Sequence, residues 1–221
     1  MSPSPPSRNS AFIFDLDGVI IDSMPMHVSA WRIYLNRLGI PIEDLEMRMH
    51  GRRNDELVLE LFGDHLSAAE VFEHGAAKER LFREMMQPAL EAKIVPGVRD
   101  FLMRADGIPR ALASNAEPAN IDFVLDRAGL RGSFDVIVDG HQVAHPKPWP
   151  DIYLRAADLL GRTPAQCIVF EDSPTGIEAA RAAGSRVVGV GTHTMDLDGV
   201  DVVIRDFRDP GLERWLENQS C

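Results

Sequence analysis

Cysteine is scarce in this chain, which has two among 221 residues: Cys167 in the apolar run CIVF and Cys221 at the last position. Two cysteines placed in this way do not make the disulfide framework that small secreted proteins use. The opening segment, MSPSPPSRNS, lacks the apolar core of a signal peptide. We therefore expect a reducing, cytoplasmic setting, and we interpret residues 1–10 as a disordered lead-in.

Long apolar runs and positive charge are also in short supply. No apolar run is long enough to cross a bilayer, so we expect no membrane span. Lys and Arg total 23 against 34 for Asp and Glu, which leaves a formal net charge of −11. A chain this acidic is a poor partner for a nucleic-acid backbone or an anionic membrane surface. A phosphorylated ligand would need a local site, with a metal ion to balance its charge.

Several catalytic motifs are missing as well. The chain has no P-loop, no paired-cysteine zinc site and no Ser-His-Asp nucleophile elbow. The segment GVG at Gly189–Gly191 lacks the third glycine of a dinucleotide-binding fingerprint. These absences exclude the commonest nucleotide-binding and zinc-binding classes.

Short apolar runs alternate with helical patterns along most of the chain. The runs that predict strands are Ala11–Leu16, Pro109–Ser114, Phe134–Val138, Cys167–Glu171, Arg186–Val190 and Asp201–Ile204. Helical patterns lie near Gly97–Asp106, Pro118–Ala128, Pro150–Leu160 and Pro174–Ala183. Both faces of the strands are largely apolar, as in a parallel sheet covered on both sides. The alternation predicts an α/β fold with a doubly wound, Rossmann-like parallel sheet.

One long stretch breaks this alternation. From Asp22 to about Val95 there is no strand pattern, and apolar residues recur at helical spacing. Helical patterns continue near Asn54–Phe62 and Ala68–Leu90. A crossover of this length indicates a domain inserted in the sheet. We expect a helical cap domain at 22–95 and a core domain at 11–21 and 96–221, joined by hinges near Ile20–Ser23 and Ala92–Pro96.

Polar side chains stand where three of the predicted strands end. They are Asp15 and Asp17 after the first strand, Ser114 and Asn115 after the second, and Glu171 and Asp172 after the fourth. Ligands of open α/β sheets bind beyond the carboxyl ends of the strands, so these groups should gather at one edge. Carboxylates so close need a neutralising partner, and Mg²⁺ prefers such oxygen ligands. Either acidic pair alone could be a cap or turn former, but both together favour a metal site.

Lys147 lies in the proline-rich segment HPKPWPD. Flanking prolines restrict the backbone on either side of it. A lysine directed at the acidic edge would balance charge on an anionic substrate. Taken alone, it could equally be a solvated loop residue.

The segments DLDGV, ASN, KPWPD and EDSPTGIEAA, in this order, resemble the four motifs of the haloacid dehalogenase superfamily of phosphotransferases. The helical insert is similar to the cap of its phosphatase and beta-phosphoglucomutase branch. The resemblance implies that Asp15 is the nucleophile and Asp17 the general acid and base, with its carbonyl on Mg²⁺. It implies that Ser114 and Lys147 hold the phosphoryl group. The metal-side carboxylates would be Asp172 and Glu171.

The cap would select the substrate. His27 and Trp31 match an H-x-x-x-W pattern of the branch, Lys78 matches by spacing, and Arg52, Arg53 and Asn54 lie together in a predicted loop. We expect these six residues, with Asn115 in the core, to bind substrate. His27 and Trp31 could also be ordinary packing residues, and the arginines a solvated helix start. Mutases of this branch usually carry Ser-Arg after the glycine that corresponds to Gly51. Here Arg52, Arg53 and Asn54 follow Gly51 instead, and this difference favours hydrolysis.

These observations predict a monomeric, Mg²⁺-dependent phosphatase of a small phosphomonoester, such as a sugar phosphate, with an aspartyl-phosphate intermediate. A sugar-phosphate mutase of the beta-phosphoglucomutase type is the alternative. A non-catalytic phosphate-sensing domain is less favoured because a cap would cover its signalling surface. Dehalogenation is less favoured because Asp17 supplies the acid that a phosphate ester needs. Asp22 we interpret as a linker residue.

Overall fold

A computed structural model describes residues 10–40, 43–49, 54–63 and 65–219. Six parallel strands form one sheet in the order β3-β2-β1-β4-β5-β6. In chain order the strands are β1 (Ala11–Phe14), β2 (Arg110–Ser114), β3 (Val136–Asp139), β4 (Cys167–Glu171), β5 (Arg186–Val190) and β6 (Val202–Ile204). The predicted doubly wound α/β fold is confirmed, since β1 pairs with both β2 and β4 at the centre of the sheet.

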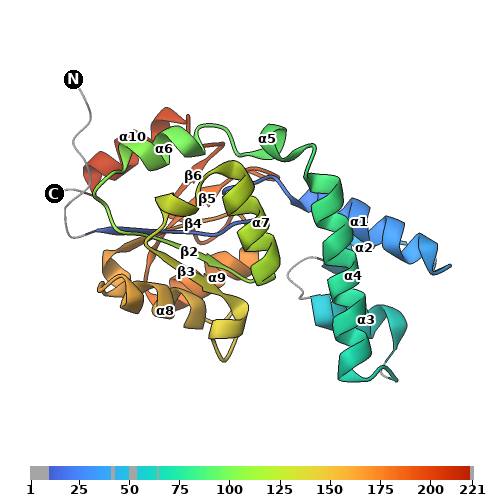
Figure 1. The fold of residues 1–221 in the computed structure, drawn as a ribbon. Coiled ribbons are helices and arrows are strands. Elements are labelled where there is room, and N and C mark those ends of the chain that lie inside the picture. The colour runs from blue at the N-terminus through green and yellow to red at the C-terminus, as the bar shows by residue number, and fades with distance from the viewer. Residues whose placement is uncertain (1–9, 41–42, 50–53, 64, 220–221) are drawn as a thin grey trace. The chain divides into compact units, whose positions relative to one another are not determined.

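Helices cover both faces of this sheet. They are α6 (Val98–Arg104), α7 (Pro118–Ala128), α8 (Asp151–Leu159), α9 (Pro174–Ala183) and α10 (Pro210–Asn218). In Figure 1, α6 and α10 lie above the sheet while α8 and α9 lie below it. Two glycines in the left-handed conformation, Gly129 and Gly184, end α7 and α9.

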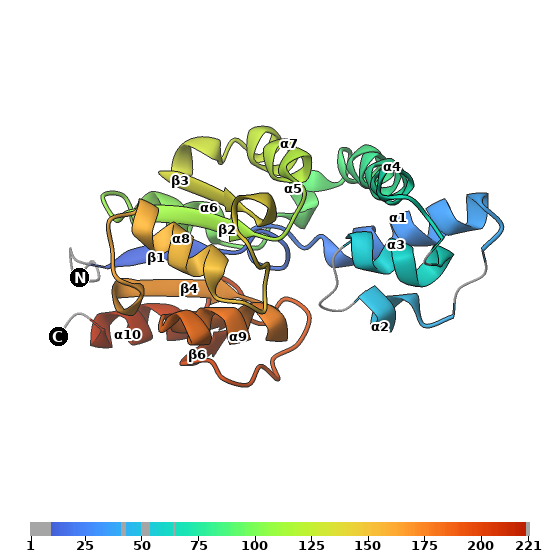
Figure 2. The ribbon, with the colours of Figure 1, turned by 90° about the horizontal axis from the view of Figure 1, so that it is seen from below.

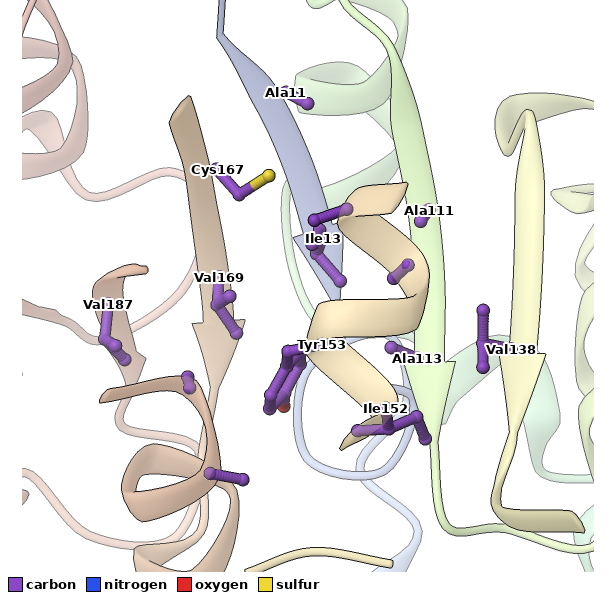
Figure 3. Close-up of a cluster of buried hydrophobic side chains, with 14 of the residues drawn as sticks. Ala11, Ile13, Ala111, Ala113, Val138, Ile152, Tyr153, Cys167, Val169 and Val187 are labelled. Atoms are coloured by element: carbon purple, nitrogen blue, oxygen red, sulfur yellow. The ribbon is translucent and has the colours of Figure 1, made fainter. Parts of the chain in front are cut away.

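Strand side chains alternate between these two layers. Ile13 and Val169 belong to the cluster between the sheet and helices α8 and α9. Figure 3 shows Ile152 and Tyr153 of α8 packed on the strands in this cluster. Phe14 points the other way and stacks on Phe170, with ring centroids 4.6 Å apart. Because Glu171 follows Phe170, its side chain lies on the α8 side of the sheet, within reach of Tyr153.

The residues that the structure describes between Asp22 and Val95 are largely helical, as the sequence predicts. The helices are α1 (Met24–Arg37), α2 (Leu45–Met49), α3 (Asn54–Phe62), α4 (Ala68–Met86) and α5 (Leu90–Lys93). Figure 2 shows α1, α3 and α4 side by side. Trp31, Leu35 and Val58 are buried in a cluster of their own in this bundle. None of the described helices is long and apolar enough to cross a membrane.

The chain divides into two compact units, one running to Asp22 and resuming at Lys93, the other spanning Ser23–Ala92. We call them the core unit and the helical unit. The domain boundaries predicted at residues 22 and 96 remain a prediction. The segment 1–9 of the predicted lead-in lies outside the described residues, while Ser10 is described and buried.

Candidate active site

The loop after β1 carries the first two candidate carboxylates. Asp15 continues the sheet by one residue, since its N–H donates to the Phe170 carbonyl at 3.0 Å. The chain then winds tightly, because the Ile20 N–H donates to the Leu16 carbonyl at 2.8 Å. Gly18 has φ of +73°, and a Cβ there would stand 1.8 Å from the Asp172 carboxylate. Only glycine therefore allows this loop to approach Asp172 so closely.

Lys147 lies at the centre of the acidic edge. Its Nζ is 2.9 Å from Asp15 Oδ1 and 2.7 Å from Glu171 Oε1. Burial on its own lowers the pKa of Lys147, but the charges of Asp15 and Glu171 outweigh it and hold that pKa well above its usual value. The lysine is therefore a fixed positive charge beside Asp15.

Glu171 is fully buried and uses both of its carboxylate oxygens. Oε1 accepts from Lys147 Nζ and, at 2.9 Å, from the Tyr153 hydroxyl. Oε2 accepts from the Asp172 and Ser173 N–H groups, each at 2.8 Å, and from the Ser173 hydroxyl. Burial raises the pKa of Glu171, but Lys147 and these hydrogen bonds bring it below its usual value. Glu171 is thus an ionised anchor for Lys147.

Sequence reasoning missed Tyr153. It is completely buried on α8, and its hydroxyl donates to Glu171. The Lys147 Nζ lies over its ring, 4.9 Å from the ring centroid. A buried tyrosine usually places its hydroxyl on a polar partner. Its position on the inner face of the helix that follows the Lys147 segment was the signal that could have identified it.

Ser114 and Asn115 complete the edge from β2. Ser114 is 2% exposed, and its Oγ accepts the Ala116 N–H at 3.2 Å. The Asn115 side chain contacts the backbone of Lys147, with Oδ1 accepting its N–H at 3.4 Å and Nδ2 donating to its carbonyl at 3.5 Å. Asn115 therefore supports the segment that carries Lys147. Its predicted contact with substrate stays a prediction.

The acids at this edge fit a divalent cation. Asp15, Glu171 and Asp172 each offer an oxygen, and these oxygens lie within 4.8 Å of one another. Burial raises the pKa of Asp15 to about 7, with Lys147 opposing the rise and Glu171 and Asp17 adding to it. Burial, then Glu171 and Asp15, raise the pKa of Asp172 well above its usual value. One lysine does not balance this charge, which suits a hard cation with oxygen ligands.

The predicted cap residues meet inside the helical unit. Lys78 Nζ is 3.3 Å from His27 Nδ1 and lies 5.2 Å over the Trp31 ring. It pairs with Glu79 Oε1 at 2.5 Å, and Asn54 donates to the same oxygen. Glu79, which is 4% exposed, was not predicted. Arg52 and Arg53 lie outside the described residues, so their predicted role stays a prediction.

Comparison with known protein families agrees with this resemblance. Residues 10–184 match the family described as haloacid dehalogenase-like hydrolase. The chain belongs to this family. It is therefore an enzyme of the haloacid dehalogenase superfamily, in the branch that the sequence resembles.

Curated relatives cover most of the chain. It is 35% identical over 187 residues to the fructose-1-phosphate phosphatase YqaB of Escherichia coli K12, covering 83% of this chain and 97% of that protein. It is 34% identical over 211 residues to the beta-phosphoglucomutase of Bacillus subtilis 168, covering 92% of each. The structure of beta-phosphoglucomutase from Clostridium difficile superposes with a TM-score of 0.82 at 28% identity, covering 95% of this chain and 97% of that one. These relatives are thus a phosphatase and two phosphomutases.

Proposed function

We propose that this protein is a Mg²⁺-dependent phosphatase that hydrolyses a small phosphomonoester through an aspartyl phosphate, an acyl phosphate formed on Asp15. The observation that carries the proposal is the buried contact of Lys147 with both Asp15 and Glu171. It sets a permanent positive charge beside a carboxylate, where a phosphoryl group must be neutralised before an anion can attack it. Sugar phosphates are the favoured substrates, since relatives include phosphatases of fructose 1-phosphate and of phosphorylated carbohydrates.

The proposed reaction has two steps. In the first, an Asp15 oxygen forms a bond to phosphorus while the ester O–P bond breaks, and Asp17 gives a proton to the leaving alcohol. In the second, water attacks phosphorus, its proton passes to Asp17, and the bond between Asp15 and phosphorus breaks. Lys147 and Ser114 hold the phosphoryl oxygens. Asp17 thereby returns to its starting state at the end of each cycle.

Asp15 and Asp172, with the Asp17 backbone carbonyl, would hold the metal ion, and Glu171 lies beside them. When bound, Mg²⁺ supplies positive charge that offsets the phosphoryl oxygens and the crowded carboxylates. Because Glu171 already accepts five hydrogen bonds, we assign it mainly to holding Lys147 and the start of α9.

A sugar-phosphate mutase is the second candidate. The 34% identity to the Bacillus subtilis beta-phosphoglucomutase favours it. The buried His27–Lys78–Glu79 group in the helical unit is compatible with either activity. The two activities differ in which hydroxyl removes the phosphate from Asp15, water or the sugar.

The test is phosphate release from sugar phosphates, nucleotides and pyrophosphate, with Mg²⁺ and with EDTA. We expect release from a sugar phosphate with Mg²⁺, none in EDTA, and inhibition by Ca²⁺, whose looser coordination does not impose octahedral geometry. Asp15→Asn should lower kcat by more than about 1,000-fold without unfolding the protein. Mass spectrometry of acid-quenched wild type should find phosphate on Asp15. Full activity in EDTA, or substantial turnover by Asp15→Asn, would contradict the proposal.

A further inference from the structure

The segment that leaves the core unit pairs with the segment that returns to it. The Asp22 N–H donates to the Lys93 carbonyl at 2.8 Å, and the Val95 N–H donates to the Ile20 carbonyl at 3.0 Å. Ile21 and Ile94 form an antiparallel bridge between these bonds. The outgoing and returning segments are therefore a short two-stranded ribbon, which begins directly after the loop that carries Asp15 and Asp17.

A side-chain ion pair joins the ribbon at its end. Lys93 Nζ donates to Asp22 Oδ2 at 2.8 Å, and the two side chains are 30% and 29% exposed. The other oxygen, Asp22 Oδ1, is buried and accepts no hydrogen bond from any residue that the structure describes. His193 Nε2 lies 3.5 Å from it. Lys93 and His193 thus approach the Asp22 carboxylate through different oxygens.

His193 belongs to the loop that follows β5, and this loop also contacts the loop of the candidate nucleophile. The neighbouring Thr192 donates its hydroxyl to the Gly18 carbonyl at 2.5 Å. Gly18 is the residue whose close approach to Asp172 requires glycine. The segment Thr192–His193 therefore contacts the loop from Asp15 to Ile21 near its middle, at Gly18, and just beyond its end, at Asp22.

We propose that Asp22 is a positioning residue of the reaction, acting with Lys93 and His193 as a clasp. The clasp fixes the end of the loop from Asp15 to Ile21. Ser114 lies on β2, and Lys147, although it contacts Asp15, is also anchored by Glu171 of β4. Loosening it moves Asp15 and Asp17 relative to the phosphoryl group and leaves the groups that bind phosphate in place. This inference rests on the proposed function, and it assigns a role to a residue that the sequence alone indicates only as a linker.

Hydrogen exchange tests the clasp without reference to activity. Lys93→Met removes the ion pair and leaves the residues that carry the reporting amides, Asp22 and Val95, unchanged. We expect exchange of both amides to quicken about fivefold, as for a partly exposed ion pair. Lys93→Arg should restore protection. Glu213→Gln, which breaks the exposed pair of Arg104 and Glu213, is the matched control and should leave both amides unchanged.

Kinetics test the positioning role. Asp22→Asn and Lys93→Met should each lower kcat by roughly tenfold while KM and the inhibition constant of inorganic phosphate stay within about twofold, because Ser114 and Lys147 are undisturbed. Lys93→Arg should recover most of kcat. Unchanged kcat with faster exchange, or equal losses in kcat and phosphate binding, would overturn the positioning role. A wild type that releases no phosphate from any substrate would instead refute the proposed function, while the exchange result would still report on the clasp.

Discussion

At the scale of single residues, Tyr153 supports both charged groups that adjoin Asp15. Its hydroxyl donates to Glu171, and its ring face carries the Lys147 ammonium. Both contacts are buried, so water does not compete for them, and each is worth more than it would be at the surface.

Tyr153→Phe removes the hydroxyl and keeps the ring. We predict a kcat roughly tenfold lower at saturating Mg²⁺, because Glu171 loses a donor and holds Lys147 less firmly. Tyr153→Leu, which also removes the ring, should lower kcat further. Steady-state phosphate release gives the comparison, with circular dichroism as the check on folding. Equal rates for wild type and Tyr153→Phe would show that the hydroxyl does not contribute.

The buried carboxyl of Asp15 makes the stability of the metal-free protein depend on pH. Burial raises its pKa from 3.8 to about 7 against the pull of Lys147. Between these values the folded chain keeps a proton that the unfolded chain has released, so stability falls as pH rises through this window. We predict that Asp15→Asn raises the free energy of unfolding in EDTA at pH 8 by about 1 to 3 kcal/mol, and far less at pH 4.

Denaturant unfolding at the two pH values measures this difference. Saturating Mg²⁺ should reverse the order at pH 8, because the wild type then gains binding free energy that the variant largely lacks. A difference between the proteins that is the same at pH 4 and pH 8 would contradict a raised pKa for Asp15.

At the scale of elements, the start of α9 fits closely around Glu171. A Cβ on Gly176 would stand 1.7 Å from Glu171 Oε1, the oxygen that accepts from Lys147 and Tyr153. The helix can therefore pass Glu171 only with glycine at this position. The Ser173 hydroxyl, which accepts the Gly176 N–H at 3.1 Å, caps the same turn.

Gly176→Ala should displace the Glu171 carboxylate from Lys147 and lower kcat by at least about tenfold. The fraction of folded protein should fall by a smaller factor than kcat. Gly132→Ala is the matched control, since a Cβ at Gly132 would meet nothing within 4 Å. Phosphate release and thermal unfolding of both variants check the prediction. Unaltered kcat in Gly176→Ala would mean that the position of Glu171 does not control that of Lys147.

Periodicity and end signals predicted most of these elements. The predicted bounds of β4, β5, α7 and α9 agree with the structure. For the two helices the signals are a Pro in the first turn and a Gly directly after the last residue. The pattern failed at α2 and α10, which it did not predict, and at residues 68–90, where α4 ends at Met86 and a separate α5 follows. Short amphipathic segments carry too few repeats to be distinguished from loops.

The candidate site could be predicted only in part, for a physical reason. Asp15, Glu171 and Asp172 stand at or directly after strand ends, so the topology of a parallel sheet brings them to one edge. Lys147 lies in the loop between β3 and α8, and the resemblance rather than the topology assigned it to this edge. Tyr153, Glu79 and Lys93 act through contacts between elements far apart in the sequence. Those contacts depend on packing, which no local pattern encodes.

At the scale of the whole molecule, the chain combines two units with separate interiors. The core unit holds Asp15, Lys147, Glu171 and Asp172, while the helical unit buries Lys78 and Glu79 among its own helices. The groups to which we assign the chemistry therefore lie in one unit. His27, Trp31 and Lys78, which we expect to bind substrate, belong to the other unit, whereas Asn115 belongs to the core unit.

This division leaves the fate of the phosphate on Asp15 as the property that separates the two candidate activities. A mutase must exclude water and present a sugar hydroxyl, whereas a phosphatase admits water for Asp17 to deprotonate. The sequence after Gly51, Arg52-Arg53-Asn54, departs from the Ser-Arg of the mutases that the chain resembles. We predict that with beta-glucose 1-phosphate and a trace of glucose 1,6-bisphosphate, inorganic phosphate appears faster than glucose 6-phosphate. Asp15→Asn, assayed in parallel, corrects for contaminating phosphatases. Many molecules of glucose 6-phosphate formed per phosphate released would replace hydrolysis with the mutase reaction, because the same phosphoenzyme would then be discharged by sugar rather than water.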